Sequence, residues 1–410
     1  GNNRTHDEVI RREVRQYESA WFDSDKVKLS RDRIDRLGYF ESVTAEPKPV
    51  PGTRDQVDLE VNVKERPTGS ISLGAGYSTS EGIILSVGFA QNNVFGTGNS
   101  VSVDVNTSKS QRTYALSVTE PYVTPEGISR TYDLYDRKVD LEELDVADVK
   151  YETRGAGVSW GIPFTELDRV FLGTRVESTH VDANPRSPRR YQNYVEKFGD
   201  NPVSVALTLG WSRDSRDNSL APTRGVYQRL SGELGLPGLD IQYYKATYQY
   251  QHYIPLSRTW TLALNGEVDG STDQFPFFKN FYVGGIGSVR GYDSGTLGPK
   301  DYSANSDGDN LGGDRMITGN IEILAPLPGG DRTLRIFGFL DAGYAWGYEG
   351  DQHGNYTRQK IDFADLRYST GFGIAWISPL GPLKFSIAFP LNDKEGDDTQ
   401  RFQFQIGTGF

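Results

Sequence analysis

The chain lacks cysteine and has only four histidines among its 410 residues. Without cysteine it forms neither a disulfide nor a thiolate metal site. The histidines are scattered and show no metal-ligand spacing, so we expect no metal site; they are His6, His180, His252 and His353. The sequence also lacks the Gly-x-x-x-x-Gly-Lys-Ser/Thr phosphate loop that binds nucleotides. We therefore expect no metal, no cofactor and no enzymatic activity.

Long hydrophobic runs are absent as well. No segment approaches the ~18 consecutive apolar residues of a transmembrane helix, which excludes a helical membrane protein. The mean hydropathy is −0.55. A transmembrane β-barrel needs only segments of ~10 residues with alternating polarity, so the low hydropathy leaves that class open. The sequence is instead rich in glycine (46 residues) and tyrosine (23 residues), and many short strands with glycine-rich turns are typical of an all-β closed structure.

Residues 1–67 form a head with 13 basic and 14 acidic residues, whereas the remaining residues carry 31 and 41. In the head, Thr5-His6-Asp7-Glu8 fits a helix capping box, and apolar residues at helical spacing follow as far as Trp21. A second helix is predicted from Ser24 to Gly38, and alternating segments near 43–45 and 57–63 predict two strands. Two helices and two strands make a thin core, so we expect a preceding strand to be missing. No apolar leader begins the chain, which indicates a mature or truncated fragment.

Residues 68–410 show strand after strand. We predict sixteen, at 69–79, 82–94, 100–112, 113–122, 128–140, 151–164, 168–182, 201–215, 224–235, 241–256, 259–270, 315–327, 334–347, 364–379, 381–391 and 400–410. Alternate connections are short and the others are long, and an even number of strands suits a bacterial outer-membrane barrel. The predicted fold is an all-β transmembrane barrel of sixteen antiparallel strands, preceded by a small α+β domain.

The first and last strands must pair to close this barrel. Glycines interrupt both of them, and glycine weakens a strand because it adds no packing and loses more backbone entropy. We expect this junction to be the weakest of the barrel, although relief of crowding in a curved sheet explains the glycines equally well. The residues singled out here are Gly69, Ser70, Ile71, Ser72, Leu73 and Gly74 in the first strand, and Gln403, Phe404, Gln405, Gly407 and Phe410 in the last.

The interval 271–313 is far longer than most connections, and loops of this length are usually functional or disordered. It contains the glycine-rich stretch Gly284-Gly285-Ile286-Gly287-Ser288, followed by Val289, Arg290, Gly291 and Tyr292. An arginine that turns into a lumen needs carboxylate partners. Glu322 and Asp341 lie on the polar faces of the next two strands, so Arg290 is expected to reach both.

These motifs together resemble the BamA family of outer-membrane β-barrel assembly proteins. The resemblance covers the chain from end to end and rests on Val289-Arg290-Gly291-Tyr292, Gly312-Gly313-Asp314, Asn320-Ile321-Glu322, Phe339-Leu340-Asp341-Ala342-Gly343 and the segment 378–383. The head is similar to a POTRA domain through three segments: Arg11-Arg12-Glu13, Arg33 to Phe40 and Gln56-Val57-Asp58-Leu59. Where the family usually has phenylalanine after the glycine of the motif, this sequence has Tyr292, which keeps an aromatic ring there.

The resemblance implies that residues 1–67 are the last of five POTRA domains, in the periplasm, and that 68–410 are the barrel, with 271–313 as a lumenal loop six. It implies insertion and folding of barrel proteins in the outer membrane without ATP, at the junction of the first and last strands. The implied partners are the lipoproteins of the BAM complex, above all BamD, together with unfolded client proteins and outer-membrane lipids. For BamD the candidate contacts are Arg11, Arg15 and Glu18 on one face of the first helix; no nucleic-acid partner is expected.

Two other functions are open at the level of sequence. A secretion translocator of the same superfamily would share the POTRA domain and the loop arginine, and would thread an extended polypeptide through the lumen. A passive diffusion channel would conduct ions steadily and would not need the head. For Arg290, a structural role in holding the loop is the main alternative to a direct role in handling clients.

Overall fold

The computed structural model describes residues 1–165, 167–218, 221–238, 240–272, 275–303, 308–327, 334–378 and 381–406. The chain forms two compact units. One comprises Gly1–Ser72, Gly88–Asp104 and Leu116–Tyr132, and the other Leu73–Val87, Val105–Ala115 and Asp133–Phe410. The first unit therefore contains the predicted head together with parts of the early barrel strands, so its boundaries differ from those of the sequence division.

The head has the predicted order of elements: α1 (Asp7–Arg11), α2 (Ser24–Arg36), β1 (Phe40–Pro49) and β2 (Val57–Glu65). The carboxylate of Asp23 caps α2 by accepting hydrogen bonds from the backbone N–H groups of Asp25 and Lys26. Gly38, with φ of 72°, ends the helix as predicted. β1 and β2 pair antiparallel, and Ile34 of α2 is fully buried in a small apolar cluster with Phe40 and Val63.

The prediction for the first helix is wrong in extent. Helix α1 ends at Arg11, and Trp21, predicted to be part of its buried face, is 93% exposed. The capping box does not form, because the backbone N–H of Thr5 donates to Glu65 (2.7 Å) and its hydroxyl accepts from Asn93 (2.8 Å). The N–H and hydroxyl groups that the capping box would use are thus bound by residues remote in the sequence.

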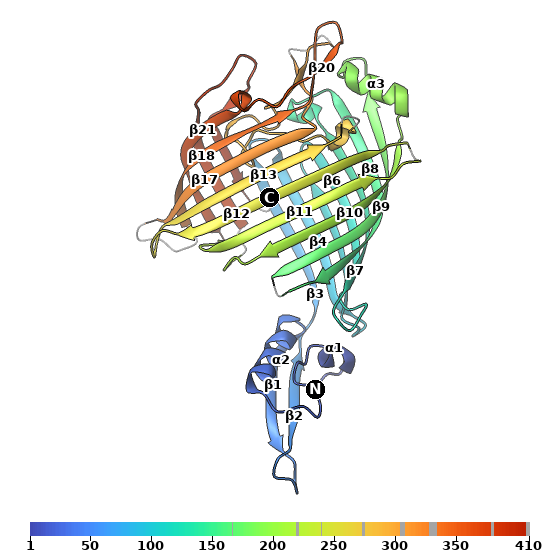
Figure 1. Ribbon diagram of the computed structural model, residues 1–410, viewed down its shortest axis with the longest axis vertical. Helices are drawn as coiled ribbons and strands as arrows, with labels where there is room; N and C mark the ends of the chain where they lie inside the picture. Colours follow the sequence, from blue (N-terminus) through green and yellow to red (C-terminus); the bar gives the residue numbers. More distant parts are fainter. Residues whose placement is uncertain are drawn as a thin grey trace. The chain divides into compact units, whose positions relative to one another are not determined.

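Within the described residues, sixteen strands close into one barrel, which confirms the predicted fold class. Figure 1 shows these strands side by side, strongly tilted, in the wall. They are β3 (Gly69–Ser78), β4 (Gly82–Val94), β5 (Asn99–Thr107), β6 (Gln111–Glu120), β7 (Ser129–Asp140), β8 (Val149–Pro163), β9 (Asp168–Ala183), β10 (Val203–Asp214), β11 (Gly225–Gly235), β12 (Tyr243–Pro255), β13 (Thr261–Ser271), β17 (Arg315–Pro326), β18 (Leu334–Trp346), β21 (Arg367–Ser378), β22 (Gly381–Pro390) and β24 (Phe402–Ile406).

The wall follows the two-residue period of β-strands. On β17, Ile321 and Ile323 are exposed on the outer face, whereas Thr318 is buried on the inner one. The same alternation places apolar side chains toward lipid and polar ones toward the lumen, as an outer-membrane barrel requires.

The first and last strands of the wall are neighbours in the closed barrel. The register of β8 with β9 runs from Val149↔Ala183 to Pro163↔Arg169. Between β3 and β24, whose described residues end at Ile406, it includes Gln405↔Ser78 and Ile406↔Tyr77. We call this junction of β3 and β24 the seam.

Smaller elements lie between the barrel strands. They are η1 (Glu142–Leu144), α3 (Arg189–Phe198), η2 (Phe277–Lys279), β14 (Gly291–Tyr292), β15 (Lys300–Asp301), β16 (Asp309–Asn310), β19 (Tyr348–Gly350), β20 (Tyr356–Arg358), η3 (Phe363–Asp365) and β23 (Thr399–Gln400). Helix α3 was not predicted from the sequence. Its Tyr191 is fully buried and stacks on Phe277 of loop six at 4.0 Å between ring centroids, so tertiary packing supports this short helix.

Candidate functional site

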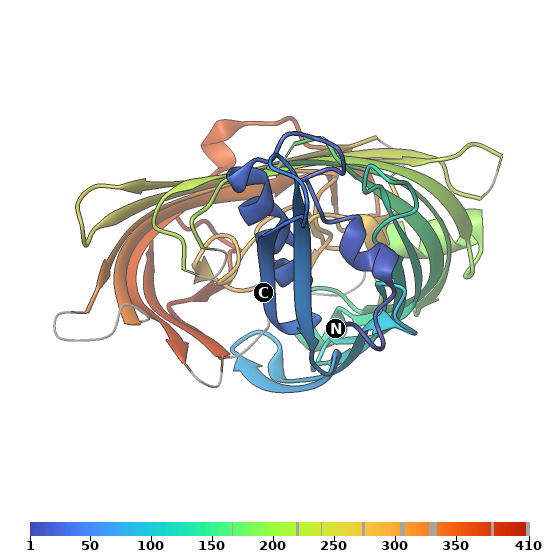
Figure 2. The ribbon, with the colours of Figure 1, turned by 90° about the horizontal axis from the view of Figure 1, so that it is seen from below.

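Loop six lies inside the ring of barrel strands, where Figure 2 shows its segments enclosed by the wall. The glycine-rich stretch makes a tight turn there: Gly284 and Gly285 have φ of 119° and 92°, a region that glycine adopts without steric cost. The hydroxyl of Ser288 accepts from the N–H of Gly284 (2.8 Å) and donates to its carbonyl oxygen (3.0 Å). This turn presents the residues that follow, Val289 to Tyr292, to the inner wall.

Arg290 is 2% exposed and is bound by the two carboxylates that the strand pattern placed on the lumen face. Its Nε and Nη2 donate to the two oxygens of Asp341 (2.7 and 2.6 Å), and Nη1 donates to Oε1 of Glu322 (2.6 Å). The guanidinium lies 3.6 Å from the ring centroid of Phe339. Burial lowers the pKa of Arg290, but the bonds and charges of Asp341 and Glu322 outweigh it and raise that pKa above its ordinary value. The pair with Asp341 is bidentate, the geometry that a guanidinium fork favours.

A second cation completes this cluster. Nζ of Lys384, on β22, donates to the same Glu322 oxygen (3.1 Å), so two cations face two carboxylates. Asn320 adds hydrogen bonds to Asp341 (3.0 Å) and to the carbonyl oxygen of Ser288 (2.6 Å). Lys384 was not among the residues predicted for this site, although a lysine between the apolar residues Leu383 and Phe385 is a signal for the lumen face of a strand. We call Arg290, Glu322, Asp341 and Lys384 the Arg290 anchor.

The other residues of the motif are fully enclosed. Val289 is buried in a cluster with Val283, Leu297 and Tyr344. Tyr292 is buried as well, and its hydroxyl donates to the carbonyl oxygen of Tyr368 (3.3 Å). Tyrosine therefore keeps the aromatic packing and adds one long hydrogen bond.

Loop six has a second charged attachment that sequence analysis missed. Nζ of Lys279 lies 2.7 Å from Glu177 on β9 and 2.8 Å from Glu233 on β11. The hydroxyls of Tyr135 and Tyr243 donate to the same two carboxylates. A single lysine in the aromatic run 275–282 is the signal that was available. We call Lys279, Glu177 and Glu233 the Lys279 anchor.

The seam lies where β3 and β24 meet. Gln403 and Gln405 of β24 are buried, whereas Phe402 faces outward at 48% exposure, as predicted by alternation. Phe404 stacks on Tyr77 at 5.1 Å between ring centroids. The described register brings Tyr77 and Ser78 to β24; it does not bring the predicted segment 69–74 to residues 402–406. Gly407 and Phe410 lie outside the described residues.

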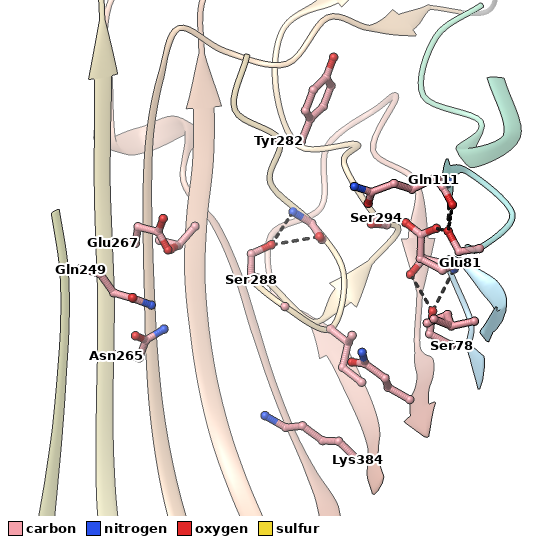
Figure 3. Close-up of a pocket in the computed structure, with 18 of the residues that line it drawn as sticks. Ser78, Glu81, Gln111, Gln249, Asn265, Glu267, Tyr282, Ser288, Ser294 and Lys384 are labelled. Carbon is pink, nitrogen blue, oxygen red and sulfur yellow. Dashed lines mark hydrogen bonds between the residues drawn. The ribbon is translucent and has the colours of Figure 1, made fainter. Parts of the chain in front are cut away.

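The lumen holds a polar cavity of about 1130 Å³. Figure 3 shows Ser288 of loop six facing it together with Lys384, Asn265 and Glu267 from the wall. Glu81 accepts hydrogen bonds there from the hydroxyls of Ser108 (2.6 Å) and Ser110 (2.5 Å).

The candidate partner residues of the head do not share a helix face. Arg11 pairs with Glu18 (3.4 Å) at the surface, but α1 ends at Arg11, so Arg15 and Glu18 lie beyond it. The backbone N–H of Arg15 donates to Ser30 (2.7 Å) and its guanidinium to the carbonyl oxygen of Arg12 (2.8 Å). The prediction that these three residues share one helix face is therefore wrong. Arg11 and Glu18 instead form an exposed ion pair.

Comparisons with known proteins agree with this architecture. Residues 93–410 match the model of the Omp85 superfamily domain, and residues 1–66 match the POTRA model, described as a surface antigen variable number repeat. The outer membrane protein assembly factor BamA of Neisseria meningitidis serogroup B is 41% identical over 100% of this chain and 56% of that protein. The protein of the same name from Nitratidesulfovibrio vulgaris is 31% identical over 100% of this chain and 50% of its own length. The chain thus spans about half the length of these curated relatives.

A solved structure is similar over nearly the whole chain. The crystal structure of BamA from Haemophilus ducreyi lacking POTRA domains 1–3 matches with a TM-score of 0.83 and 30% identity, over 99% of this chain and 82% of that one. CdiB from Acinetobacter baumannii shares the fold, with a TM-score of 0.63 at 14% identity over 99% of this chain and 72% of that one. With a POTRA match at its head and a closed barrel behind it, the chain belongs to the Omp85 superfamily of outer-membrane proteins.

Proposed function

We propose that this protein inserts and folds β-barrel proteins in the bacterial outer membrane, by offering the edge strands of its seam to client strands. The observation that carries the proposal is that β3 and β24, the first and last strands of the wall, are neighbours, with Gln405 paired to Ser78 and Ile406 to Tyr77. An incoming strand has unpaired backbone groups that lipid does not satisfy, at a cost of several kcal/mol per group. A parted seam supplies a pairing edge for them. The folding of the client itself would drive the process, without ATP and without an enzymatic step.

The parts of the chain take the following roles in this proposal. Residues 1–67 act as the last POTRA domain and residues 68–410 as the barrel. Strands β3 and β24 act as the gate, and the Arg290 anchor holds loop six in the lumen. The relatives named BamA support a place in the BAM complex. For BamD we propose the exposed pair Arg11 and Glu18 as the contact, with Arg15 as a residue that positions this segment against α2.

A disulfide across the seam tests the proposal. Tyr77 and Ile406 are Cα partners and the chain has no native cysteine, so Tyr77→Cys with Ile406→Cys introduces the only possible bridge. In proteoliposomes that receive an unfolded client, we expect the oxidised variant to stop client assembly and reduction to restore it. Trp211→Cys with Leu230→Cys, which are Cα partners in the firmly paired β10 and β11, is the matched control and should assemble clients in both states.

The outcome against the proposal is an oxidised seam variant that assembles clients at the rate of the reduced one. Ion flux through the same liposomes distinguishes an assembly protein from a passive diffusion channel. A large steady conductance without client folding would indicate a diffusion channel.

A further inference from the structure

The last barrel strand carries a glutamine that binds the loop-six motif. Gln403, on β24, is 1% exposed. Its Nε2 donates to the carbonyl oxygen of Tyr292 (2.8 Å), and its Oε1 accepts from the N–H of Gly291 (3.3 Å). One side-chain amide thus pairs with a donor and an acceptor of the loop backbone, as the peptide group of a neighbouring strand would.

Backbone contacts reinforce the attachment at the same place. Strand β14 of the motif pairs with β23, just before β24, through Gly291↔Gln400 and Tyr292↔Thr399. Next to this pair, the N–H of Asp293 donates to the carbonyl oxygen of Asp398 (2.9 Å). The motif therefore lies as a short strand against the start of the last barrel strand.

Gly291 permits this close approach. It has φ of 91°, and an added Cβ would lie 3.1 Å from Cβ of Ala388 and 3.3 Å from Pro390, both on β22. The adjacent side chain, that of Arg290, is directed to Glu322 on β17 and Asp341 on β18. Successive residues of the motif thus connect two different groups of strands.

We infer that Gln403 is a positioning residue that couples the seating of loop six to closure of the seam. In the described part of the chain, β24 is held by β22 over the register from Leu383↔Ile406 to Ile387↔Phe402, by the motif through Gln403, and by its register with β3. Gln403 precedes Gln405 and Ile406, the residues that pair with β3, by two and three positions, so its bonds to the motif bear directly on the alignment of β24 at the seam. A seated loop six fixes Gln403 and keeps β24 aligned with β3. Displacement of loop six removes this hold and favours opening.

The inference rests on the proposed function in one respect, namely that opening of the seam serves client insertion. The coupling itself is tested without a client. The Tyr77→Cys and Ile406→Cys pair reports seam closure by the rate of disulfide formation under mild oxidation. Into this background we introduce Gln403→Glu, whose carboxylate keeps the shape of the amide but has no N–H to donate to Tyr292. Leaving a buried carbonyl group unsatisfied shifts an equilibrium by about tenfold or more, and we expect crosslinking to slow to that extent.

Acid rescue distinguishes this coupling from a general loss of packing. Lowering the pH protonates the introduced carboxylate and restores a donor toward Tyr292. Acid also lowers the thiolate fraction of every variant, so each rate is divided by that of the unsubstituted pair at the same pH, and this ratio should recover for Gln403→Glu. Gln403→Leu should be slow at every pH, because it has no donor to restore. Gln228→Glu places the same substitution on β11, away from the seam, where the carboxylate still accepts from the hydroxyl of Tyr248 (3.2 Å), and should crosslink like the unsubstituted pair across the pH series. The altered electrophoretic mobility of the unheated barrel verifies folding of each variant.

Crosslinking of Gln403→Glu and Gln403→Leu at the rate of the unsubstituted pair would overturn the inference, as would equal acid recovery of both. Client assembly is measured separately in the variants that keep Tyr77 and Ile406. Slowed crosslinking with acid rescue and unchanged client assembly would support the coupling and count against the proposed function. Lost assembly with unchanged crosslinking would overturn the coupling and leave the proposed function standing.

Discussion

The two anchors of loop six hold the same loop to different parts of the barrel. The Arg290 anchor joins β17, β18 and β22, and lies beside the seam through Gln403. The Lys279 anchor joins β9 and β11, which the sheet order separates from β24 by the whole run of strands from β3 to β8. Loop six is thus fastened both near the seam and in the firmly paired wall.

The chemistry of the two cations differs as well. The guanidinium of Arg290 uses its planar fork on Asp341, a side chain with no solvent exposure, and rests on the ring of Phe339. The ammonium of Lys279 is a point charge between two carboxylates that accept further bonds from tyrosines. An arginine fork fixes orientation, whereas an ammonium group tolerates rotation. The comparison teaches that the anchor beside the seam is the orienting one and the anchor in the wall the more adaptable one.

The largest effect is expected for Arg290→Ala. It leaves Asp341 buried without its cationic partner, and breaking a buried pair in this way costs about 3–5 kcal/mol. Loop six should loosen, with a lower yield of folded barrel and faster proteolysis within residues 271–313. Arg290→Lys keeps the positive charge but lacks the planar fork. Its rate of loop proteolysis should lie between those of the unsubstituted protein and Arg290→Ala. Unchanged proteolysis of loop six in Arg290→Ala would show that this anchor does not hold the loop.

Lys279→Ala is expected to have the second largest effect, at about 2–4 kcal/mol. It leaves Glu177 and Glu233 without their shared cation, but Arg175 lies 3.6 Å from Glu177 and compensates in part. Proteolysis should begin near residues 275–283 rather than at the motif, and seam crosslinking should be unchanged. Loss of seam closure in this variant would break the comparison, because both anchors would then control the seam.

The sequence allowed the barrel and the partners of Arg290 to be predicted for one physical reason. A strand alternates its faces with a period of two, so once β17 and β18 are recognised, Glu322 and Asp341 must face inward. No comparable periodicity predicts which wall residues a loop as long as loop six will contact. The contacts of Lys279 with β9 and β11, and of Gln403 with the motif, join residues 46–112 positions apart, and only the folded lumen brings them together. The capping box near Thr5 failed for the same reason, since Glu65 and Asn93 are remote in sequence.

Lys384→Met tests whether charge balance belongs to the Arg290 anchor. The substitution removes the second cation from Glu322, which keeps Arg290 at 2.6 Å, so we expect a loss of only about 1 kcal/mol. In a double-mutant cycle with Glu322→Gln the two substitutions should couple, because both act on one ion pair. The free energy of unfolding is measured for each variant. Additive effects of the two substitutions would show that Lys384 does not belong to the Arg290 anchor.

The smallest effect is expected for Tyr292→Phe. The hydroxyl of Tyr292 makes a long bond of 3.3 Å to a neutral carbonyl oxygen, and the loss should be about 0.5 kcal/mol. Tyr243→Phe, the matched substitution at the Lys279 anchor, removes a donor to the carboxylate of Glu233 and should cost about 1.5–3 kcal/mol, since bonds to charged groups are stronger. Loss of the tyrosine hydroxyl is thus expected to cost more at the Lys279 anchor, whereas loss of the cation is expected to cost more at the Arg290 anchor. If Tyr292→Phe proved the more damaging, the orienting function of the Arg290 anchor would extend through the aromatic residue of the motif and not through the guanidinium alone.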